Sequence, residues 1–197
     1  MPFPARISLD AILATARHLL ETSGPDGLTM RALARELRVS APSLYFHVES
    51  REDLLTQLVS QGLQELAAAM RAAANRPGTF RARIETLAQA YIAFASANPQ
   101  LFTLIFGPWH DEPTYPRAAG GEAAEPVLAL AAEVAGPDQA LLVSEALWSL
   151  VHGYTVLHLA HQFRANPDHE AGFLFALDAL VAGLESVTAP PLAGNTL

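Results

Sequence analysis

Three hydrogen-bonding side chains lie close together in the sequence, at Ser43, Tyr45 and His47. Leu44 and Val48 lie between and after them, four positions apart, which is the spacing of one face of an α-helix. The polar and aromatic side chains would then lie on or near the outward face. A hydroxyl, a phenol and an imidazole can each bond a phosphate oxygen or a base edge. We therefore treat all three as candidate nucleic-acid contacts, against the alternatives that Tyr45 is a core aromatic and His47 a cap or packing residue.

A second helical pattern precedes this segment and is joined to it by a tight turn. Thr29 is a hydroxyl N-cap, after which apolar residues recur at i, i+3, i+4 and i+7 over residues 30–37. Ser40 can cap the following helix, and Pro42 lies in its first turn, where a missing N–H costs nothing. Two short helices joined in this way form the outline of a helix-turn-helix. The helix expected near residues 41–47 would enter the major groove of DNA.

Two arginines mark the helix starts of this motif. Arg31 and Arg51 lie at predicted helix N-termini, where a cation opposes the helix dipole unless an anion is close. A guanidinium and the N–H groups of a helix terminus can share one phosphate, although solvated surface charge is the alternative. The full set of candidate DNA-binding residues is Thr29, Arg31, Ser40, Ala41, Pro42, Ser43, Tyr45, His47 and Arg51.

This stretch resembles the tetracycline-repressor (TetR) family of bacterial transcription factors. The resemblance extends from about residue 9 to residue 63 and is carried by Thr29, Arg31, Leu33-Ala34, Leu37, Val39-Ser40, Pro42, the run Leu44-Tyr45-Phe46-His47-Val48 and the run from Ser50 to Leu55. It implies a repressor that binds a palindromic double-stranded DNA operator as a homodimer and is released by a small hydrophobic effector. Ala41 and Glu49 depart from the family pattern, which implies poorer base reading at Ala41 and weaker phosphate attraction near Glu49.

The composition favours an all-α fold. Of the 197 residues, 51 % are hydrophobic, Ala and Leu dominate over β-branched residues, and the mean hydropathy is +0.21. These values are high for a soluble monomer and suggest that a partner chain covers some apolar surface. Start and stop signals predict about nine helices and no sheet. They include caps at Ser8 and Asn98, a helix end near Ser23-Gly24-Pro25, a capping box over Ser50-Arg51-Glu52-Asp53 and a helix at Glu122–Ala135. We expect a helix-turn-helix domain at 1–50, a helical effector-binding and dimerisation domain at 51–188, and a flexible tail at 189–197.

Composition also limits the classes of function. The chain has no cysteine, so disulfides, thiolate metal sites and cysteine nucleophiles are excluded. It has no uninterrupted run of 18 apolar residues and too short an apolar N-terminus for a signal peptide, so we expect a cytoplasmic protein without membrane contact. Phosphate-binding, dinucleotide-binding and hydrolase motifs are missing, so we expect no enzyme and no cofactor. A helical dimeric protein-interaction module without specific DNA binding is the remaining alternative.

The predicted body contains the candidate effector site. The stretch Trp148-Ser-Leu-Val-His-Gly153 resembles a Trp-His-Gly motif of one branch of the same family, in which the last two helices form the dimer interface. Because basic residues are few there, we expect a neutral or cationic hydrophobic effector. The candidate pocket residues, for which core packing is the alternative, are Tyr91, Phe94, Phe102, Trp109, Trp148 and His152. Tyr154 could likewise line a cavity or fill the core.

Histidines on one predicted helix raise the question of a metal site. His158 and His161 are three positions apart, which permits chelation in principle. A carboxylate or cysteine at a neighbouring turn would be needed to complete the ligand set, and the sequence offers none. We therefore predict no metal and expect a buried, hydrogen-bonded histidine instead.

Overall fold

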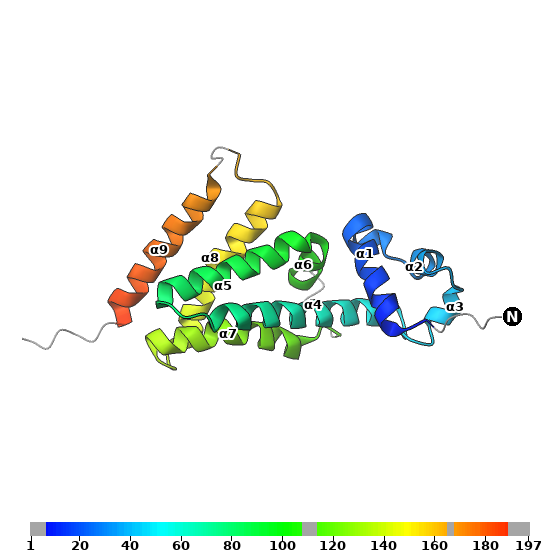
Figure 1. Cartoon of the computed structure of the whole chain (residues 1–197), viewed down its shortest axis with the longest axis horizontal. Helices are drawn as coiled ribbons and strands as arrows, with labels where there is room; N and C mark the ends of the chain where they lie inside the picture. Colours follow the sequence, from blue (N-terminus) through cyan, green and yellow to red (C-terminus); the bar gives the residue numbers. More distant parts are fainter. Residues whose placement is uncertain (1–6, 108–113, 165–167, 189–197) are drawn as a thin grey trace, which may run out of the picture. The chain divides into compact units, whose positions relative to one another are not determined.

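The structure, a computed structural model, describes residues 7–107, 114–164 and 168–188. These residues form nine α-helices and no strand, so the prediction of an all-α fold with about nine helices is confirmed (Figure 1). In chain order the helices are α1 (Leu9–Gly27), α2 (Met30–Glu36), α3 (Ala41–Leu44), α4 (Arg51–Ala74), α5 (Phe80–Ala97), α6 (Pro99–Phe106), α7 (Arg117–Ala135), α8 (Ala140–Leu159) and α9 (His169–Thr188).

The chain divides into two compact units. One comprises Met1–Leu66 and Phe94–Glu122, and the other comprises Ala67–Ala93 and Ala123–Leu197. Helices α4, α5 and α7 therefore each belong partly to both units. The predicted domain division near residue 50 stays a prediction.

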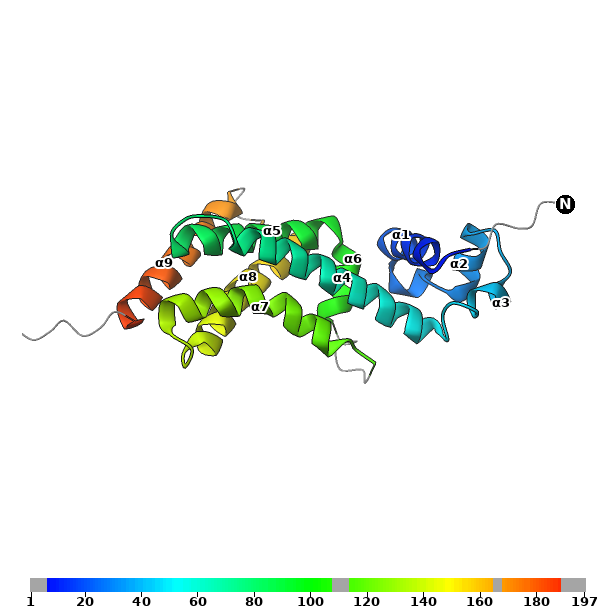
Figure 2. The same cartoon turned by 60° about the horizontal axis from the view of Figure 1, so that its bottom comes forward.

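The first unit gathers α1, α2 and α3 at one end of α4 (Figure 2). The Ser8 hydroxyl caps α1 by accepting a hydrogen bond from the N–H of Ala11 at 3.2 Å. Gly24 adopts a φ of 69° just before Pro25, which kinks the chain where the sequence predicts the end of the first helix. Fully buried side chains of this part of the unit are Ile12, Leu20, Leu28, Leu33, Leu44 and Leu54.

The second unit is organised by α8 and α9, which contact each other. On α9 the buried residues recur every four positions, so one stripe of the helix faces the unit's interior. On α8 the buried positions likewise form one face of the helix. The core residues contributed by these two helices are Val143, Leu147, Val151, Phe173, Leu177 and Val181.

Helix α8 has a composition that bears on the expectation of no membrane contact. Among the described residues it is the one helix long and apolar enough to cross a membrane, with a mean hydropathy of 1.3. Of its most apolar 18-residue stretch, 33 % is buried. The expectation rested on the absence of an uninterrupted apolar run, and α8 has polar residues such as Ser144 and Glu145 within its apolar stretch. Helix α8 packs on α9, and its buried positions lie in the interior of the second unit.

Candidate nucleic-acid interface

The helix-turn-helix is built from local backbone signals. The Thr29 hydroxyl caps α2 by accepting a hydrogen bond from the N–H of Ala32 at 3.1 Å, as the sequence predicts. Arg38 then adopts a left-handed conformation with a φ of 56°. This residue reverses the chain, and the N–H of Val39 closes the turn on the carbonyl of Ala34 at 2.9 Å. The tight turn between the two helices therefore depends on one non-glycine residue in an unfavourable backbone region.

The second helix of the motif is shorter than predicted. The α-helical hydrogen-bond pattern covers Ala41–Leu44, and residues 45–47 continue as turns. The carbonyl of Leu44 accepts hydrogen bonds from the N–H groups of both His47, at 2.9 Å, and Val48, at 3.1 Å. This doubly used carbonyl tightens the chain instead of extending the helix. The predicted inward residues are correct, because Leu44 and Val48 are 0 % and 1 % exposed.

The outward face of this segment is aromatic and polar. Tyr45 is 52 % exposed, so the alternative that it is a core aromatic is wrong. The exposed residues of the predicted contact set are Thr29, Arg31, Ser40, Pro42 and Tyr45, and the half-buried residues are Ala41, Ser43, His47 and Arg51.

Phe46 is an exposed aromatic that the predicted contact set did not include. Its side chain is 88 % exposed, the largest exposed fraction among the exposed large hydrophobic residues of the described chain. Its position between two predicted contacts was visible in the sequence. The structure has turns at residues 45–47.

Ser40 does not cap the second helix with its hydroxyl, contrary to the prediction. It occupies the N-cap position with a φ of −77° and a ψ of 144°, but its side chain makes no capping hydrogen bond. Its Oγ instead lies 2.7 Å from the Oγ of Ser43, and either atom can donate. The two hydroxyls therefore form a pair on the outward side of α3.

Arg51 has a structural role that the sequence did not reveal. Its Nε donates to the carbonyl of Leu28 at 2.9 Å, and its Nη2 donates to the carbonyl of Pro25 at 2.6 Å. These bonds tie the first residue of α4 to the end of α1 and the connection that follows it. A phosphate contact by Arg51 stays a prediction, and its guanidinium is already oriented by two carbonyl groups.

The first turn of α4 forms the predicted capping box. The Ser50 hydroxyl accepts a hydrogen bond from the N–H of Asp53 at 3.0 Å, and the Asp53 carboxylate accepts one from the N–H of Glu49 at 2.8 Å. Two helix-terminal donors are thereby satisfied by side chains. The capping box fixes where α4 begins, directly after the outward-facing segment.

Within the first unit, α6 is held to α1 by charged side chains. The two carboxylate oxygens of Glu21 accept hydrogen bonds from the N–H groups of Gln100, at 3.1 Å, and Leu101, at 2.9 Å. Arg17 donates to Asn98 Oδ1 at 2.8 Å and forms two bonds with Glu65 of α4, at 2.8 and 2.7 Å. Asn98 occupies the predicted N-cap position of α6, but its side chain makes no cap hydrogen bond. Glu21 of α1 satisfies the N-terminal donors instead.

Helix α6 also lies close to α4 in this unit. A Cβ atom added to Gly62 would lie 2.7 Å from Leu101 Cδ2, a distance shorter than side chains permit. A glycine at this position therefore allows the close approach. Because α6 contacts both α1 and α4, it is anchored to two of the helices that support α2 and α3.

The predicted effector residues are only partly brought together. In the second unit, Tyr91 Oη lies 2.8 Å from His152 Nδ1, and the rings of Trp148 and His152 lie 5.1 Å apart. Burial lowers the pKa of His152 below its ordinary value, which favours the neutral imidazole. Phe94 and Phe102 are buried in the first unit, and Trp109 lies outside the described residues.

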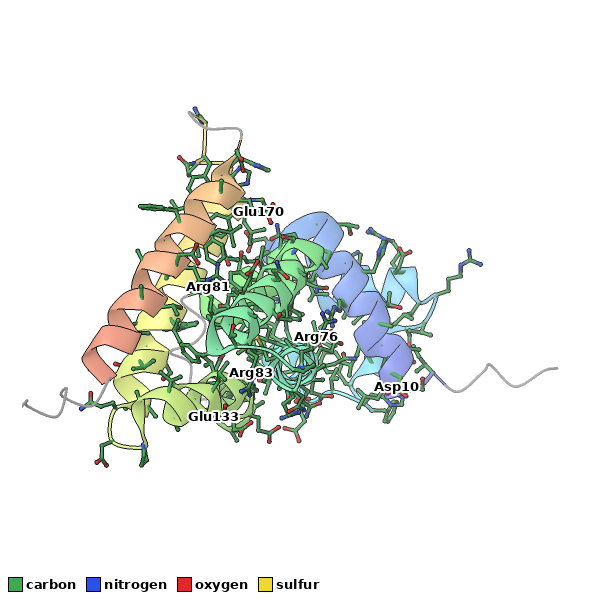
Figure 3. The ribbon with its side chains drawn as sticks, turned by 60° about the vertical axis from the view of Figure 1, so that its left-hand side comes forward. Asp10, Arg76, Arg81, Arg83, Glu133 and Glu170 are labelled. Atoms are coloured by element: carbon green, nitrogen blue, oxygen red, sulfur yellow. The ribbon has the colours of Figure 1, made fainter. Side chains whose placement is uncertain are left out.

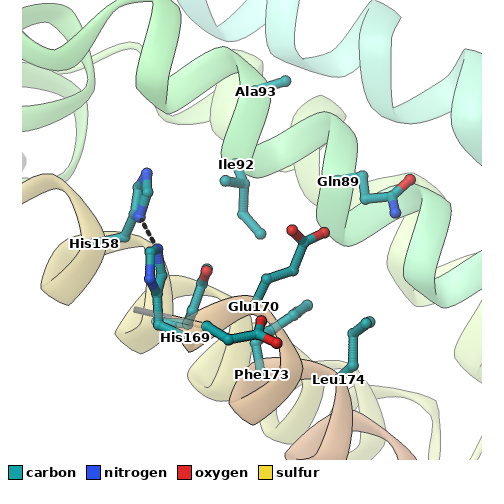
Figure 4. Close-up of a pocket in the computed structure, with 10 residues that line it drawn as sticks. Gln89, Ile92, Ala93, His158, His169, Glu170, Phe173 and Leu174 are labelled. Carbon is teal, nitrogen blue, oxygen red and sulfur yellow. Dashed lines mark hydrogen bonds between the residues drawn. The ribbon is translucent and has the colours of Figure 1, made fainter. Parts of the chain in front are cut away.

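The second unit contains a cavity at other residues. Its volume is about 340 Å³, and none of the six predicted effector residues lines it (Figure 4). The lining residues are Gln89, Ile92 and Ala93 of α5, Tyr154 and His158 of α8, Asp168, and His169, Glu170, Phe173 and Leu174 of α9. Tyr154 was considered as a pocket residue from the sequence, but the acids and rings of α9 were missed, because their approach to α8 depends on tertiary packing.

His158 pairs with a different histidine from the one considered. Its Nδ1 lies 3.0 Å from Nε2 of His169, and the two rings are 5.1 Å apart. His161 is exposed and has a left-handed φ of 53°. Within the part of the chain that the structure describes, no group of three or more His, Cys, Asp or Glu side chains is arranged to hold a metal ion.

Comparison with known proteins decides the family. The family model described as "Bacterial regulatory proteins, tetR family" matches residues 12–58, and the "Tetracyclin repressor-like, C-terminal domain" matches residues 84–180. An uncharacterized HTH-type transcriptional regulator of Mycobacterium tuberculosis is 30 % identical over 190 residues, covering 94 % of this chain and 85 % of the relative. The chain belongs to the TetR family. This TetR-family protein is therefore a helix-turn-helix transcriptional regulator.

Solved structures agree with this assignment. A protein of unknown function from Rhodococcus sp. RHA1 is similar with a TM-score of 0.78 and 27 % identity, covering 96 % of this chain and all (100 %) of that chain. A single-residue variant of TetR from Acinetobacter baumannii AYE, in complex with minocycline, is similar with a TM-score of 0.69 and 25 % identity, covering 93 % of this chain and 99 % of that chain. The family consists of DNA-binding regulators and not of enzymes, which agrees with the prediction of no enzymatic activity.

The last two helices of this TetR-family regulator expose large apolar side chains. On α8 they recur with helical spacing, and on α9 Phe175 is 77 % exposed. The exposed residues of α8 are Leu141, Leu142, Trp148, Val156 and Leu157. An apolar surface of this kind usually marks an interaction site.

Ion pairs hold the rest of the second unit together. Arg81 of α5 pairs with Glu85 at 2.8 Å and with Asp178 of α9. Arg83 pairs with Glu133 of α7 at 2.5 Å, and Figure 3 shows these two side chains beside each other. Helix α5 is thus linked to both α7 and α9 of this unit by side-chain charges.

Proposed function

We propose that this chain is a cytoplasmic repressor that binds a palindromic operator as a homodimer and is released from it by a small hydrophobic effector. The observation that carries the proposal is the outward face of α3 and the turn after it. That face presents hydroxyl, phenol and imidazole groups, and α2 of the same helix-turn-helix carries the exposed Arg31. These groups suit phosphate and base contacts, and Tyr45 is 52 % exposed.

The proposed contacts divide into two kinds. Tyr45, His47, Thr29, Arg31 and Arg51 would bind phosphates, which fixes the position of the protein on the duplex. Ser40, Ala41, Pro42 and Ser43 lie at the start of α3 and would approach base edges in the major groove. Phe46, which is exposed beside Tyr45, would contact sugar or thymine methyl groups.

A homodimer is supported by the apolar surface on α8 and α9. One protomer leaves that surface uncovered, and a symmetric partner would bury the same residues on both copies. The two helix-turn-helix domains of the dimer, one head per protomer, would then bind two half-sites. The half-sites would lie one helical turn of DNA apart, about 34–36 Å, or a multiple of that distance. Two heads also explain how a short recognition segment reaches useful affinity, because both sets of contacts must be broken for release.

An effector is supported by the family and by the chemistry of the second unit. The TetR variant from A. baumannii is described in complex with minocycline, and we propose that this chain also binds a small molecule with large apolar surface. Tyr91, Trp148 and His152 form one candidate cluster, and the cavity lined by α5, α8 and α9 forms another. Phe94, Phe102 and Trp109 remain proposed effector contacts.

The experiment that tests the proposal is operator binding by Tyr45 variants. We expect Tyr45→Ala to weaken binding to the operator about 100-fold, since each of two heads loses a hydrogen bond to a charged phosphate worth about 1.5 kcal/mol. Tyr45→Phe, which removes only the hydroxyl, should reproduce most of the loss. Fluorescence anisotropy with a labelled duplex measures both, and Thr103→Ala, an exposed hydroxyl on α6, serves as the control.

The same experiment distinguishes the alternative function. A protein-interaction module would show no preference among duplexes and no effect of Tyr45→Ala. Unchanged operator affinity in a folded Tyr45→Ala protein would contradict the proposed interface.

A further inference from the structure

The cavity lined by α5, α8 and α9 has an aromatic wall centred on Tyr154. The Tyr154 ring lies 4.6 Å from the ring of Phe173, 5.9 Å from that of His158 and 6.1 Å from that of His169. All four residues line the cavity. The hydrogen bond between His158 and His169 joins α8 to α9 at this wall, so its rings are held by tertiary contacts and not by one helix alone.

The charge beside this wall is negative. Asp168 and Glu170 line the cavity, and neither Lys nor Arg is among its lining residues. Acids near the start of α9 also stabilise the helix through its dipole, and Asp168 acts in this way by accepting a hydrogen bond from the N–H of Ala171 at 3.1 Å. Glu170 is exposed in the first turn of α9, and Figure 4 shows it among the cavity residues.

The Glu170 carboxylate and the aromatic wall line the same cavity. Burial, and to a smaller extent the charge of Glu170, raises the pKa of Tyr154 above its ordinary value. A ligand in this cavity would therefore meet both the Glu170 carboxylate and the Tyr154 ring. Aromatic faces and a nearby carboxylate together attract a cation, whereas they repel an anion.

We propose that this cavity binds a hydrophobic organic cation, with its positive group between the aromatic wall and Glu170 and its apolar part against Ile92, Ala93 and Leu174. The volume of about 340 Å³ lies at the lower end of the range for small-molecule sites, so the ligand is a compact aryl or alkyl ammonium compound. The inference deepens the proposed function, on which it rests for its biological meaning, because it gives the chemical class of the effector.

The test compares a cation with its neutral counterpart. The probes are benzyltrimethylammonium and neopentylbenzene, in which carbon replaces the cationic nitrogen, and ligand-observed NMR titration measures both affinities on the full chain without DNA. We expect the cation to bind more tightly than the neutral isostere. Glu170→Gln should weaken cation binding several-fold, because the attraction between an exposed carboxylate and a cation is modest. The variant should leave binding of the isostere unaffected, because the isostere carries no charge. Glu125→Gln, an exposed acid of α7 outside the cavity, should change neither affinity.

A second variant tests the aromatic wall. Tyr154→Leu keeps apolar volume but lacks a π face, so it should weaken cation binding several-fold and isostere binding less. Circular dichroism establishes that the variant is folded.

Three results would overturn the inference: equal affinity for the two probes, an unchanged cation affinity in Glu170→Gln, or no binding of the cation. Operator binding is measured on the same preparations. If the unchanged chain binds the operator but not the cation, this inference alone is contradicted. Cation binding without any DNA binding by the unchanged chain removes the proposed function and leaves the cation site in place.

Discussion

A Phe175→Arg variant should be monomeric at micromolar concentration and should bind the operator at least about 100-fold more weakly than the unchanged chain, because a single head makes too few contacts. Phe175 is 77 % exposed, so the substitution costs the isolated protomer little. In a symmetric interface, however, both copies would bury an arginine without a counter-ion, which is strongly unfavourable. Analytical ultracentrifugation measures the oligomeric state, and fluorescence anisotropy measures DNA binding.

The apolar surface offers an independent variant and a control. Leu142→Arg, at a position of α8 that is 64 % exposed, should have the same two effects. Leu128→Arg replaces the exposed leucine of α7 and should leave both the dimer and operator binding intact. If Leu142→Arg and Phe175→Arg both remain dimers, the proposed interface is wrong.

A Glu21→Ala variant should lower the free energy of unfolding by about 2 kcal/mol, because the charged carboxylate accepts two hydrogen bonds from the first turn of α6 and both donors would lose their partner. It should also reduce the change in operator affinity caused by the effector. Helix α6 contacts α1, and α1 contacts α2 of the helix-turn-helix, so we propose that a shift of α6 reaches the DNA-binding residues through this link.

The measurements are denaturant unfolding and operator titration with and without effector. Glu21→Gln retains an acceptor oxygen and should lose less stability than the alanine variant. Glu36→Ala, an exposed acid of α2, is the matched control and should change neither property by a measurable amount. An unchanged response to effector in a folded Glu21→Ala protein would exclude this route.

Local signals in the sequence predicted most of the helix framework. The caps at Ser8 and Thr29, the break at Gly24-Pro25 and the capping box at Ser50 each depend on residues within a few positions of one another. Apolar periodicity placed Leu44 and Val48 inside correctly for the same reason. Features of this kind require no knowledge of which helices meet.

Predictions failed where a distant residue replaced the local partner. The donors at the start of α6 are satisfied by Glu21 and not by Asn98, and Arg51 donates to carbonyl groups more than twenty residues earlier. Helix α7 begins at Arg117, earlier than the predicted start at Glu122, because Gly120 and Gly121 are tolerated inside it. The cavity was missed for a related reason, since His169 and Glu170 reach Tyr154 only when α9 packs on α8.

The central claim, sequence-specific DNA binding by a dimer, is tested most directly by titrating the unchanged protein against duplexes from the region upstream of its own coding sequence, at several salt concentrations. We predict nanomolar binding to one inverted repeat with two protomers per site, falling steeply as salt rises because phosphate contacts release counterions. Binding of equal strength to a scrambled duplex, or binding of a single protomer at full affinity, would contradict the claim.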